Sequence, residues 1–141
     1  MLTGVSALGA YLSYLLGGWD TALSLMFLFM GLDYATGVCT ALLHKSAKTQ
    51  DGGFQSCVAF KGLTKKLMML VIVMLGAALD RMLGTDNVCR IAVISFYMAN
   101  EGLSILENAR LLGVPVPAVV QELLDRMKKK GDQAGGGEGK K

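Results

Sequence analysis

An apolar run over residues 21–43 constrains this chain more than any other feature, because Asp33 is the only charged residue in it. A helix rises about 1.5 Å per residue, so a run of this length extends about 35 Å, enough to cross the roughly 30 Å hydrocarbon core of a bilayer. Asp20 precedes the run and can cap its first turn. The sequence therefore predicts a transmembrane helix over residues 20–44.

The charge inside this run marks a polar helix face. Thr36, Gly37 and Thr40 follow Asp33 at three- and four-residue spacing, so all four residues share one side of a helix. Glycine at this spacing lets another helix approach closely, and threonine hydroxyls bond between helices. An ionisable residue inside the membrane is a functional candidate. The alternative is that a neighbouring helix neutralises Asp33 purely for packing.

A second apolar segment predicts a transmembrane helix over residues 63–83. Its uncharged core covers only residues 67–79, which make about 20 Å of helix. The whole segment reaches membrane length if Lys65 and Lys66 extend their charged ends to the lipid headgroups. Residues 84–89 then form a tight turn outside the cell, so the helices on either side are expected to be antiparallel neighbours.

The third apolar segment, residues 90–113, carries a polar stripe along one side. At about 100° per residue its polar side chains fall within one arc of roughly 100°, with Ile94 and Leu106 on the opposite side. A membrane helix tolerates such a stripe only where it faces protein or water. Taken alone, the segment also fits a soluble amphipathic helix packed on a core. The stripe consists of Arg90, Tyr97, Asn100, Glu101, Ser104 and Asn108.

The two ends of the chain do not match a full membrane span. Residues 1–19 begin with an uncharged apolar stretch of about 24 Å as a helix, which predicts an interfacial or re-entrant segment. Prolines end the third span, and residues 114–130 then form an amphipathic helix with a basic end. Such a helix suits an anionic membrane surface or a second copy of the chain. The glycine-rich residues 131–141 predict a disordered tail.

Composition agrees with a membrane protein. The chain is 52% hydrophobic and 18% charged, with a mean hydropathy of +0.46, whereas soluble domains carry about 25% charged residues. Most of its basic residues flank the apolar runs, as cytoplasmic flanking residues do. These residues are Lys45, Lys48, Lys61, Lys65, Lys66, Lys128, Lys129 and Lys130.

The positions of these lysines predict the orientation of the chain. The loop over residues 45–62 and the C-terminus are expected in the cytoplasm, the turn over residues 84–89 outside, and, with three spans, the N-terminus outside as well. The fold class is an all-α integral membrane protein with about three transmembrane helices, an N-terminal apolar helix and a C-terminal amphipathic helix. The net charge of the whole chain, +3, is not the signature of a nucleic-acid-binding protein, because the basic residues lie in these flanks.

The residue pattern does not point to an enzyme. Cys39, Cys57 and Cys89 form no C-x-x-C pair, and the chain has one histidine. It also lacks the glycine-rich phosphate loop and any spacing of nucleophile and base that would suggest catalysis. We therefore expect no catalytic, cofactor-binding or metal-ligating residues.

An ordered set of short motifs resembles the phage-lysis and toxin-secretion holin family. The first span contains Asp33-Tyr34-x-Thr36-Gly37; Lys61-Gly62-x-x-Lys65-Lys66 precedes the second span, which ends in Leu79-Asp80. The third span runs from Arg90 through Phe96-Tyr97-x-x-Asn100-Glu101 to Ser104-Ile105-x-Glu107-Asn108, and Gly113-x-Pro115-x-Pro117 with a basic tail follows it. The resemblance covers roughly residues 25–130.

The resemblance implies a small phage-encoded protein of the host bacterial cytoplasmic membrane. Such a protein accumulates there, assembles with copies of itself and opens a lesion through which an endolysin reaches the cell wall and lyses the cell. Some relatives are associated with the export of large toxins. The bilayer and other copies are then its contacts, with the endolysin a functional partner that it need not touch.

For a holin, the intramembrane polar residues are expected to line the lesion, namely Asp33, Thr36, Thr40 and the stripe of the third span. Gly37 and Gly76 are expected at close helix contacts between copies. Two other functions stay open on the residues alone. A small multidrug-type transporter would use Asp33 as its proton- and cation-coupled carboxylate, although that fold needs four compact spans. An antiholin, which regulates a separate holin, can share the fold of the lesion-former.

Overall fold

Five helices and no strand make up the part of the chain that the computed structural model describes, residues 2–51 and 53–135. The helices are α1 (Leu2–Leu15), α2 (Thr21–Leu42), α3 (Ser56–Leu83), α4 (Val88–Leu111) and α5 (Ala118–Gly135). The all-α fold class predicted from the sequence is confirmed.

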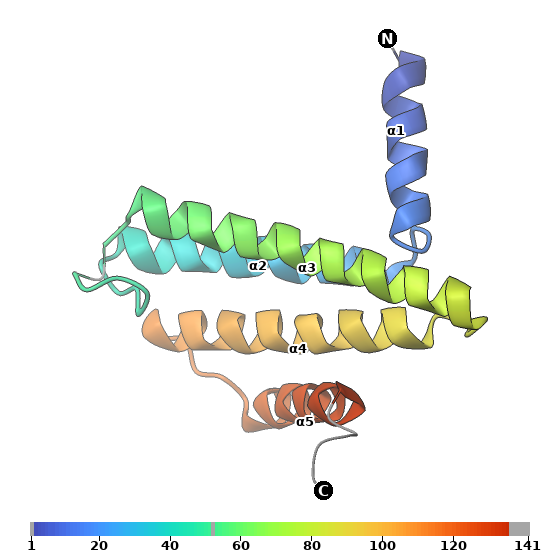
Figure 1. Cartoon of the computed structure of the whole chain (residues 1–141). Helices are drawn as coiled ribbons and strands as arrows, with labels where there is room; N and C mark the ends of the chain where they lie inside the picture. Colours follow the sequence, from blue (N-terminus) through green and yellow to red (C-terminus); the bar gives the residue numbers. More distant parts are fainter. Residues whose placement is uncertain (1, 52, 136–141) are drawn as a thin grey trace, which may run out of the picture.

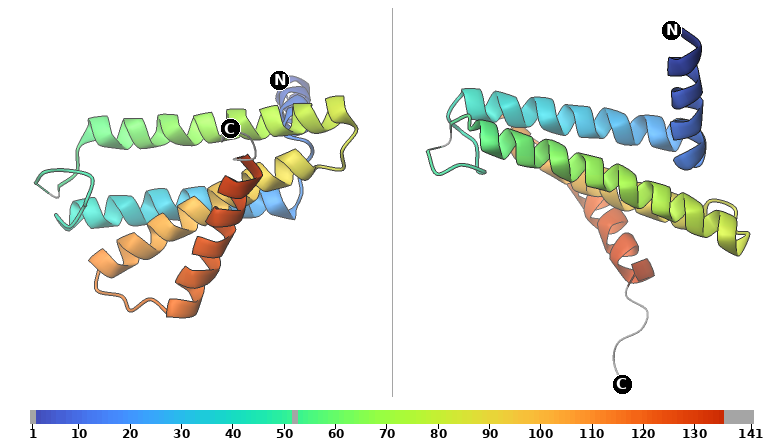
Figure 2. Two further views of the ribbon diagram at one scale, coloured as in Figure 1. Left: turned by 60° about the horizontal axis from the view of Figure 1, so that its bottom comes forward. Right: turned by 45° about the horizontal axis from the view of Figure 1, so that its top comes forward.

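Helices α2, α3 and α4 form an elongated bundle (Figure 1). α2 and α4 run in the same direction and α3 runs against both of them (Figures 1 and 2). α4 makes extensive contacts with α2, α3 and α5, whereas α2 and α3 touch each other little. The helix with the polar stripe is therefore the centre of the fold.

Each bundle helix is long and apolar enough to cross a membrane. The three helices have 22, 28 and 24 residues, and 28% of the most apolar window of each is buried within the chain. Many large apolar side chains point outward instead, for example Leu28 at 52% exposure and Leu75 at 53%. Exposed apolar surface on this scale requires lipid or another protein. The bundle thus has the outer surface of a membrane protein.

A small apolar core fills the interior between the three bundle helices toward the end where α2 begins. Methionines contribute much of it, and their flexible side chains fill irregular spaces. The core consists of Leu16, Leu23, Met26, Met30, Met69, Val73 and Ile94. The rest of the interior is polar, and it contains the candidate site.

Left-handed residues make the turns on both sides of α4. Gly84 ends α3 at φ +69° and Asn87 precedes α4 at φ +59°, so the chain reverses within a few residues. Gly113 follows α4 at φ +84°, and Pro115 and Pro117 prevent the helix from continuing.

Two helices extend beyond their predicted limits. α3 begins at Ser56, inside the loop predicted over residues 45–62, because residues 54–61 contain no glycine or proline. α5 continues to Gly135, into the predicted disordered tail. Residues 136–141 of that tail lie outside the described residues. Where the membrane begins and ends along each helix stays a prediction.

α1 stands away from the bundle, across the direction of its helices (Figure 1). Its 14 residues reach about 21 Å, which is short of a bilayer's hydrocarbon core. The Arg81 guanidinium holds its C-terminal end by bonding to the Tyr14 carbonyl and lying 4.2 Å from the centroid of the Tyr14 ring. Interfacial or re-entrant placement of α1 stays a prediction.

Candidate functional site in the charged interior of the bundle

An ion triad joins the three bundle helices in their interior. Lys66 on α3 donates from Nζ to Asp33 Oδ2 on α2 at 2.8 Å, and the same Nζ pairs with Glu101 Oε2 on α4. The Lys66, Asp33 and Glu101 side chains are 10%, 9% and 6% exposed. Each helix supplies one member, so no bundle helix can leave the others without separating buried charges.

The triad holds two carboxylates and one ammonium group, so it carries one excess negative charge when all three groups are ionised. A charge at the bilayer centre costs about 2.5–3.5 kcal/mol on insertion scales. An opposite charge offsets this cost only while the two remain in contact. Asp33 Oδ1 is buried without a hydrogen-bond partner among the described residues. The triad is therefore tolerated in lipid only in the closed bundle.

Polar contacts continue from the triad toward the end of α2. Asn108 Nδ2 on α4 donates to Thr36 Oγ1 at 3.0 Å. The Thr36 and Thr40 hydroxyls donate to the α2 carbonyls of Leu32 and Gly37, each at 2.8 Å. A Cβ at Gly37 would lie 3.8 Å from Asn108 Nδ2, an ordinary contact. The polar face predicted for α2 thus lies against α4 of the same chain.

A pocket lies between the α2–α3 loop and the triad. Its walls are this loop and the facing sides of all three bundle helices. Asn100 and Ser104 of the polar stripe line it together with Asp33, Lys66 and Glu101. The charged interior is therefore approached from the basic end of the bundle.

A second buried cluster, centred on Arg90, closes the opposite end. The Arg90 side chain is fully buried and donates to the carbonyls of Leu16 and Gly18 at 2.5 and 3.0 Å. It also donates to both carboxylate oxygens of Asp20, at 2.6 and 3.1 Å. The bond from Arg90 holds the pKa of Asp20 below its ordinary value, although burial acts in the opposite direction. Asp20 also caps α2 as predicted, accepting from the Leu23 amide at 2.9 Å.

Asp80 on α3 takes the place of a local cap for α4. Asn87, which precedes α4, makes no side-chain capping bond. Asp80 instead accepts from the amides of Cys89 and Arg90 at 2.9 and 2.8 Å. Asp80 is 3% exposed and holds α3 to α4. No local pattern marks this role, because the capping side chain comes from another helix.

The structure brings the predicted intramembrane residues to one interior. The polar stripe of α4 faces the other helices of its own chain rather than lipid. Asp33, Thr40, Arg90, Glu101 and Asn108 are buried, whereas Thr36, Tyr97, Asn100 and Ser104 are partly exposed. Among the basic flanking residues, Lys45, Lys48, Lys61, Lys65, Lys128, Lys129 and Lys130 are exposed. A role in lining a lesion stays a prediction for the intramembrane polar residues.

Lys66 and Gly76 have surroundings that differ from those expected. The sequence predicts that Lys66 reaches the headgroups, but its side chain turns inward because carboxylates on both neighbouring helices can pair with it. Gly76 lies against α4 of its own chain, where a Cβ would be 3.2 Å from the Arg90 Cα. Gly37 likewise faces α4. Both glycines thus lie against α4 within one chain, and a role at contacts between copies stays a prediction.

These features define a class of protein: a small helical membrane protein with three potential spans and its ionisable residues paired inside the bundle. Among known families, the model of the bacteriophage holin family matches residues 10–129, and the chain belongs to this family. The resemblance seen in the sequence motifs is thus confirmed. The family points to a membrane protein without enzymatic activity.

Three relatives illustrate this membership. A probable holin of Bacillus phage phi105 is 33% identical over 121 residues, which cover 81% of this chain and 84% of the relative. An uncharacterised 14.9 kDa protein in the nagH 3' region of Clostridium perfringens is 35% identical over 128 residues, covering 90% and 92%. The uncharacterised protein Lmo0128 of Listeria monocytogenes is 37% identical over 121 residues, covering 86% and 81%. No solved structure matches the chain.

Proposed function

We propose that this chain is a holin that assembles with copies of itself in the bacterial cytoplasmic membrane and opens a lesion for an endolysin or a large toxin. Its family and the relative named a probable holin support this function. The observation that carries the mechanism is the triad, which places charges from three helices inside a bundle whose outer surface is apolar. A purely structural bundle gains little from such charges, because replacing a buried ion pair by apolar residues is often neutral or stabilising.

The triad makes opening a collective event. In the closed bundle Lys66 pairs with both carboxylates and keeps the charged groups inside, so a single chain rests in lipid with an apolar surface. If α4 of one chain moved outward alone, Glu101 would lose its bond to Lys66 and face lipid at the cost given above, while Lys66 would keep only Asp33. When several chains open around a shared water-filled space, the same side chains are hydrated instead. The endolysin then needs only the passage and no contact with the chain.

The test compares Glu101→Leu and Glu101→Gln with the unchanged chain at matched membrane levels. Leucine inserts into lipid more favourably than glutamate, so membrane accumulation is expected to be preserved. The open state loses a hydrated charge, so collapse of the membrane potential is expected to be delayed or abolished. Glutamine keeps the polarity without the charge and is expected to fall between the two. Depolarisation on schedule in Glu101→Leu would leave the residue with a packing role only.

Two further assays separate the alternative functions. A small multidrug-type transporter would show proton-coupled efflux of a quaternary cation, but Asp33 is already paired with Lys66, and the described residues contain three candidate spans rather than four. An antiholin would delay depolarisation by a separate holin and cause none alone. We expect the chain, expressed by itself, to depolarise the membrane.

A further inference from the structure

The C-terminal helix α5 lies across α4, on the side of α4 turned away from the other bundle helices (Figures 1 and 2). Leu124 of α5 sits on Gly102 near the middle of α4, where a Cβ would lie 2.9 Å from Leu124 Cδ1. The Phe29 ring of α2 reaches the same contact, at 3.3 Å from that Cβ position. Toward the start of α4, Ala92 and Ser95 line a hollow with Met127 and Lys130 of α5. We call Ala92, Ser95 and Gly102 the Gly102 face.

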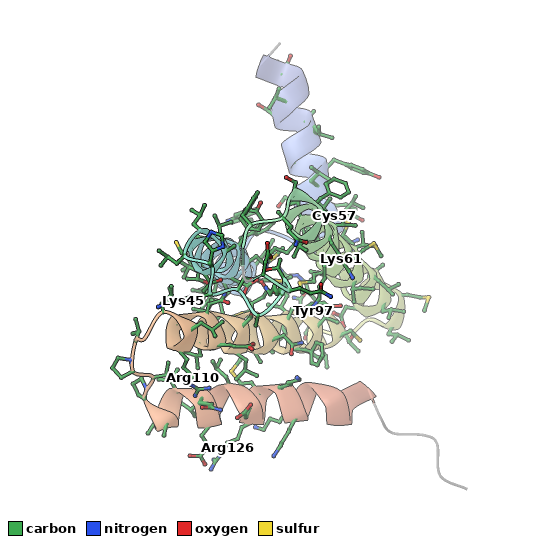
Figure 3. The ribbon with its side chains drawn as sticks, turned by 90° about the vertical axis from the view of Figure 1, so that its left-hand side faces the viewer. Lys45, Cys57, Lys61, Tyr97, Arg110 and Arg126 are labelled. Carbon is green, nitrogen blue, oxygen red and sulfur yellow. The ribbon has the colours of Figure 1, made fainter. Side chains whose placement is uncertain are left out.

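The outward-facing side of α5 carries too many charges for this position inside a bilayer. Glu122 and Arg126 form an ion pair whose side chains are 64% and 70% exposed, and Arg126 points away from α4 (Figure 3). Lys128, Lys129 and Lys130 are exposed as well. Because Leu124 contacts the middle of a candidate span, these charges would face lipid deep in the membrane, where charged side chains are strongly disfavoured.

The same helix suits the membrane surface. Val119 and Leu123, one turn apart on α5, are 67% and 56% exposed in the present arrangement, so apolar side chains are available to enter lipid. The basic side chains would then face anionic headgroups. The connection between α4 and α5 permits such a movement, since residues 112–117 are not helical and include Gly113 at φ +84°. A hydrogen bond from Arg110 to Gln121 Oε1 joins the two helices beside this connection.

We infer that, in the membrane, α5 leaves the Gly102 face for the cytoplasmic lipid surface and that the Gly102 face of a second copy takes its place. This inference rests on the proposed holin function, which requires assembly. The close approach of Leu124 shows that the face accepts another helix, and small side chains favour helix contacts in lipid. Copies inserted in one orientation are related by a rotation about the membrane normal, which brings two α4 helices together side by side. While α5 lies on α4 of its own chain, it therefore blocks pairing with α4 of a second copy.

A reversible disulfide lock tests this exchange in the full-length chain in anionic phospholipid vesicles. Gly102→Cys with Leu124→Cys, after replacing Cys39, Cys57 and Cys89 by serine, places two thiols where α5 covers α4. Relative to the same chain in its reduced state, the oxidised chain is expected to form no oligomers and to depolarise vesicles several-fold more slowly, so the comparison does not require the substituted face to behave as the native one. The control pair is Gly31→Cys with Leu124→Cys, because Gly31 has no neighbour within 4 Å and cannot be locked to α5. A locked chain that assembles and depolarises as the reduced chain does would overturn the inference.

A second measurement does not depend on the lock. Ser95→Cys is expected to form disulfides between copies in membranes several-fold more often than Val71→Cys, although Val71 is 49% exposed on α3 and Ser95 lies beneath α5. Equal or weaker crosslinking through position 95 would also overturn the inference. Measurements on the unsubstituted chain test the proposed function separately. If it assembles and depolarises while position 95 does not crosslink, the pairing face is wrong and the holin proposal stands.

Discussion

Lys66 shows how the direction of one side chain decides the interior of this protein. Lys65 and Lys66 are adjacent and identical, and either can extend to the headgroups from the start of a span. One helix step of about 100° separates them, which turns Lys66 toward Asp33 and Glu101 and leaves Lys65 exposed. Choosing between the two lysines requires knowing where the other two helices lie, and the spacing of residues in one helix does not contain this information.

The first residue-scale prediction concerns the loss of this ammonium group. Lys66→Met leaves two buried carboxylates without a positive partner, so the free energy of unfolding is expected to fall by about 3–5 kcal/mol. Lys65→Met is the matched control, expected to change it by no more than about 0.5 kcal/mol because the side chain is exposed. Equilibrium unfolding in detergent micelles measures both. Equal effects of the two substitutions would mean that the triad does not hold the helices together.

The Asp20–Arg90 bond predicts a pH dependence of definite sign. The pKa of Asp20 in the folded chain lies below its ordinary value of 3.8, since the Arg90 guanidinium stabilises the carboxylate. The contribution of this bond to stability is therefore complete above the ordinary pKa and is lost as the pH falls through the lower, folded value. The stability difference between the unchanged chain and Asp20→Asn should be constant near neutral pH and shrink only below 3.8. A difference that disappears around neutral pH would contradict this assignment.

At the scale of helices, the sequence predicts where the elements lie better than how they meet. Apolar length and 100° periodicity locate the three bundle helices and the stripe on α4, because both signals are local. The partners of the Arg90 side chain lie more than 65 residues earlier in the chain, at Leu16, Gly18 and Asp20, and Asp80 caps a helix other than its own. The packing of α5 on Gly102 is likewise a contact between two different helices. Such contacts arise from tertiary packing, which leaves no periodic pattern to read.

An element-scale prediction follows from the packing of α3 on α4. Gly76→Leu places a side chain where even a Cβ lies 3.2 and 3.3 Å from the Arg90 Cα and N, backbone atoms that cannot rotate away. Overpacking of this kind costs about 1–3 kcal/mol of unfolding free energy. Gly31→Leu is the control, since Gly31 on α2 faces open space. Detergent unfolding measures both variants. Unchanged stability in Gly76→Leu would show that the two helices are not in close contact.

Over the whole molecule, charge differs between the two ends of the bundle as well as between its interior and its surface. Lys45 and Lys61 lie at the end where α2 finishes and α3 begins (Figure 3), and Lys48 and Lys65 are exposed nearby. The opposite end holds the Arg90 cluster, whose positive charge is buried and paired with Asp20. The same end has one exposed basic residue, Arg81, which bonds to the Tyr14 carbonyl, so free positive charge is more abundant at the end with the α2–α3 loop. This asymmetry is the physical basis for an orientation in the membrane.

The last prediction is this orientation: the α2–α3 loop in the cytoplasm and the Gly84–Asn87 turn outside. The loop and the turn lie at opposite ends of the bundle, so a reagent applied from outside the cell should reach only one of them (Figure 1). With the three native cysteines replaced by serine, Lys48→Cys should resist a membrane-impermeant thiol reagent and Thr85→Cys should react with it. The reverse result would invert the chain. Thr3→Cys should also react with the reagent, because 14 residues are too few for α1 to cross. Thr85→Cys serves as its reference. If position 3 is protected while positions 48 and 85 behave as expected, α1 spans the membrane and the chain has four crossings.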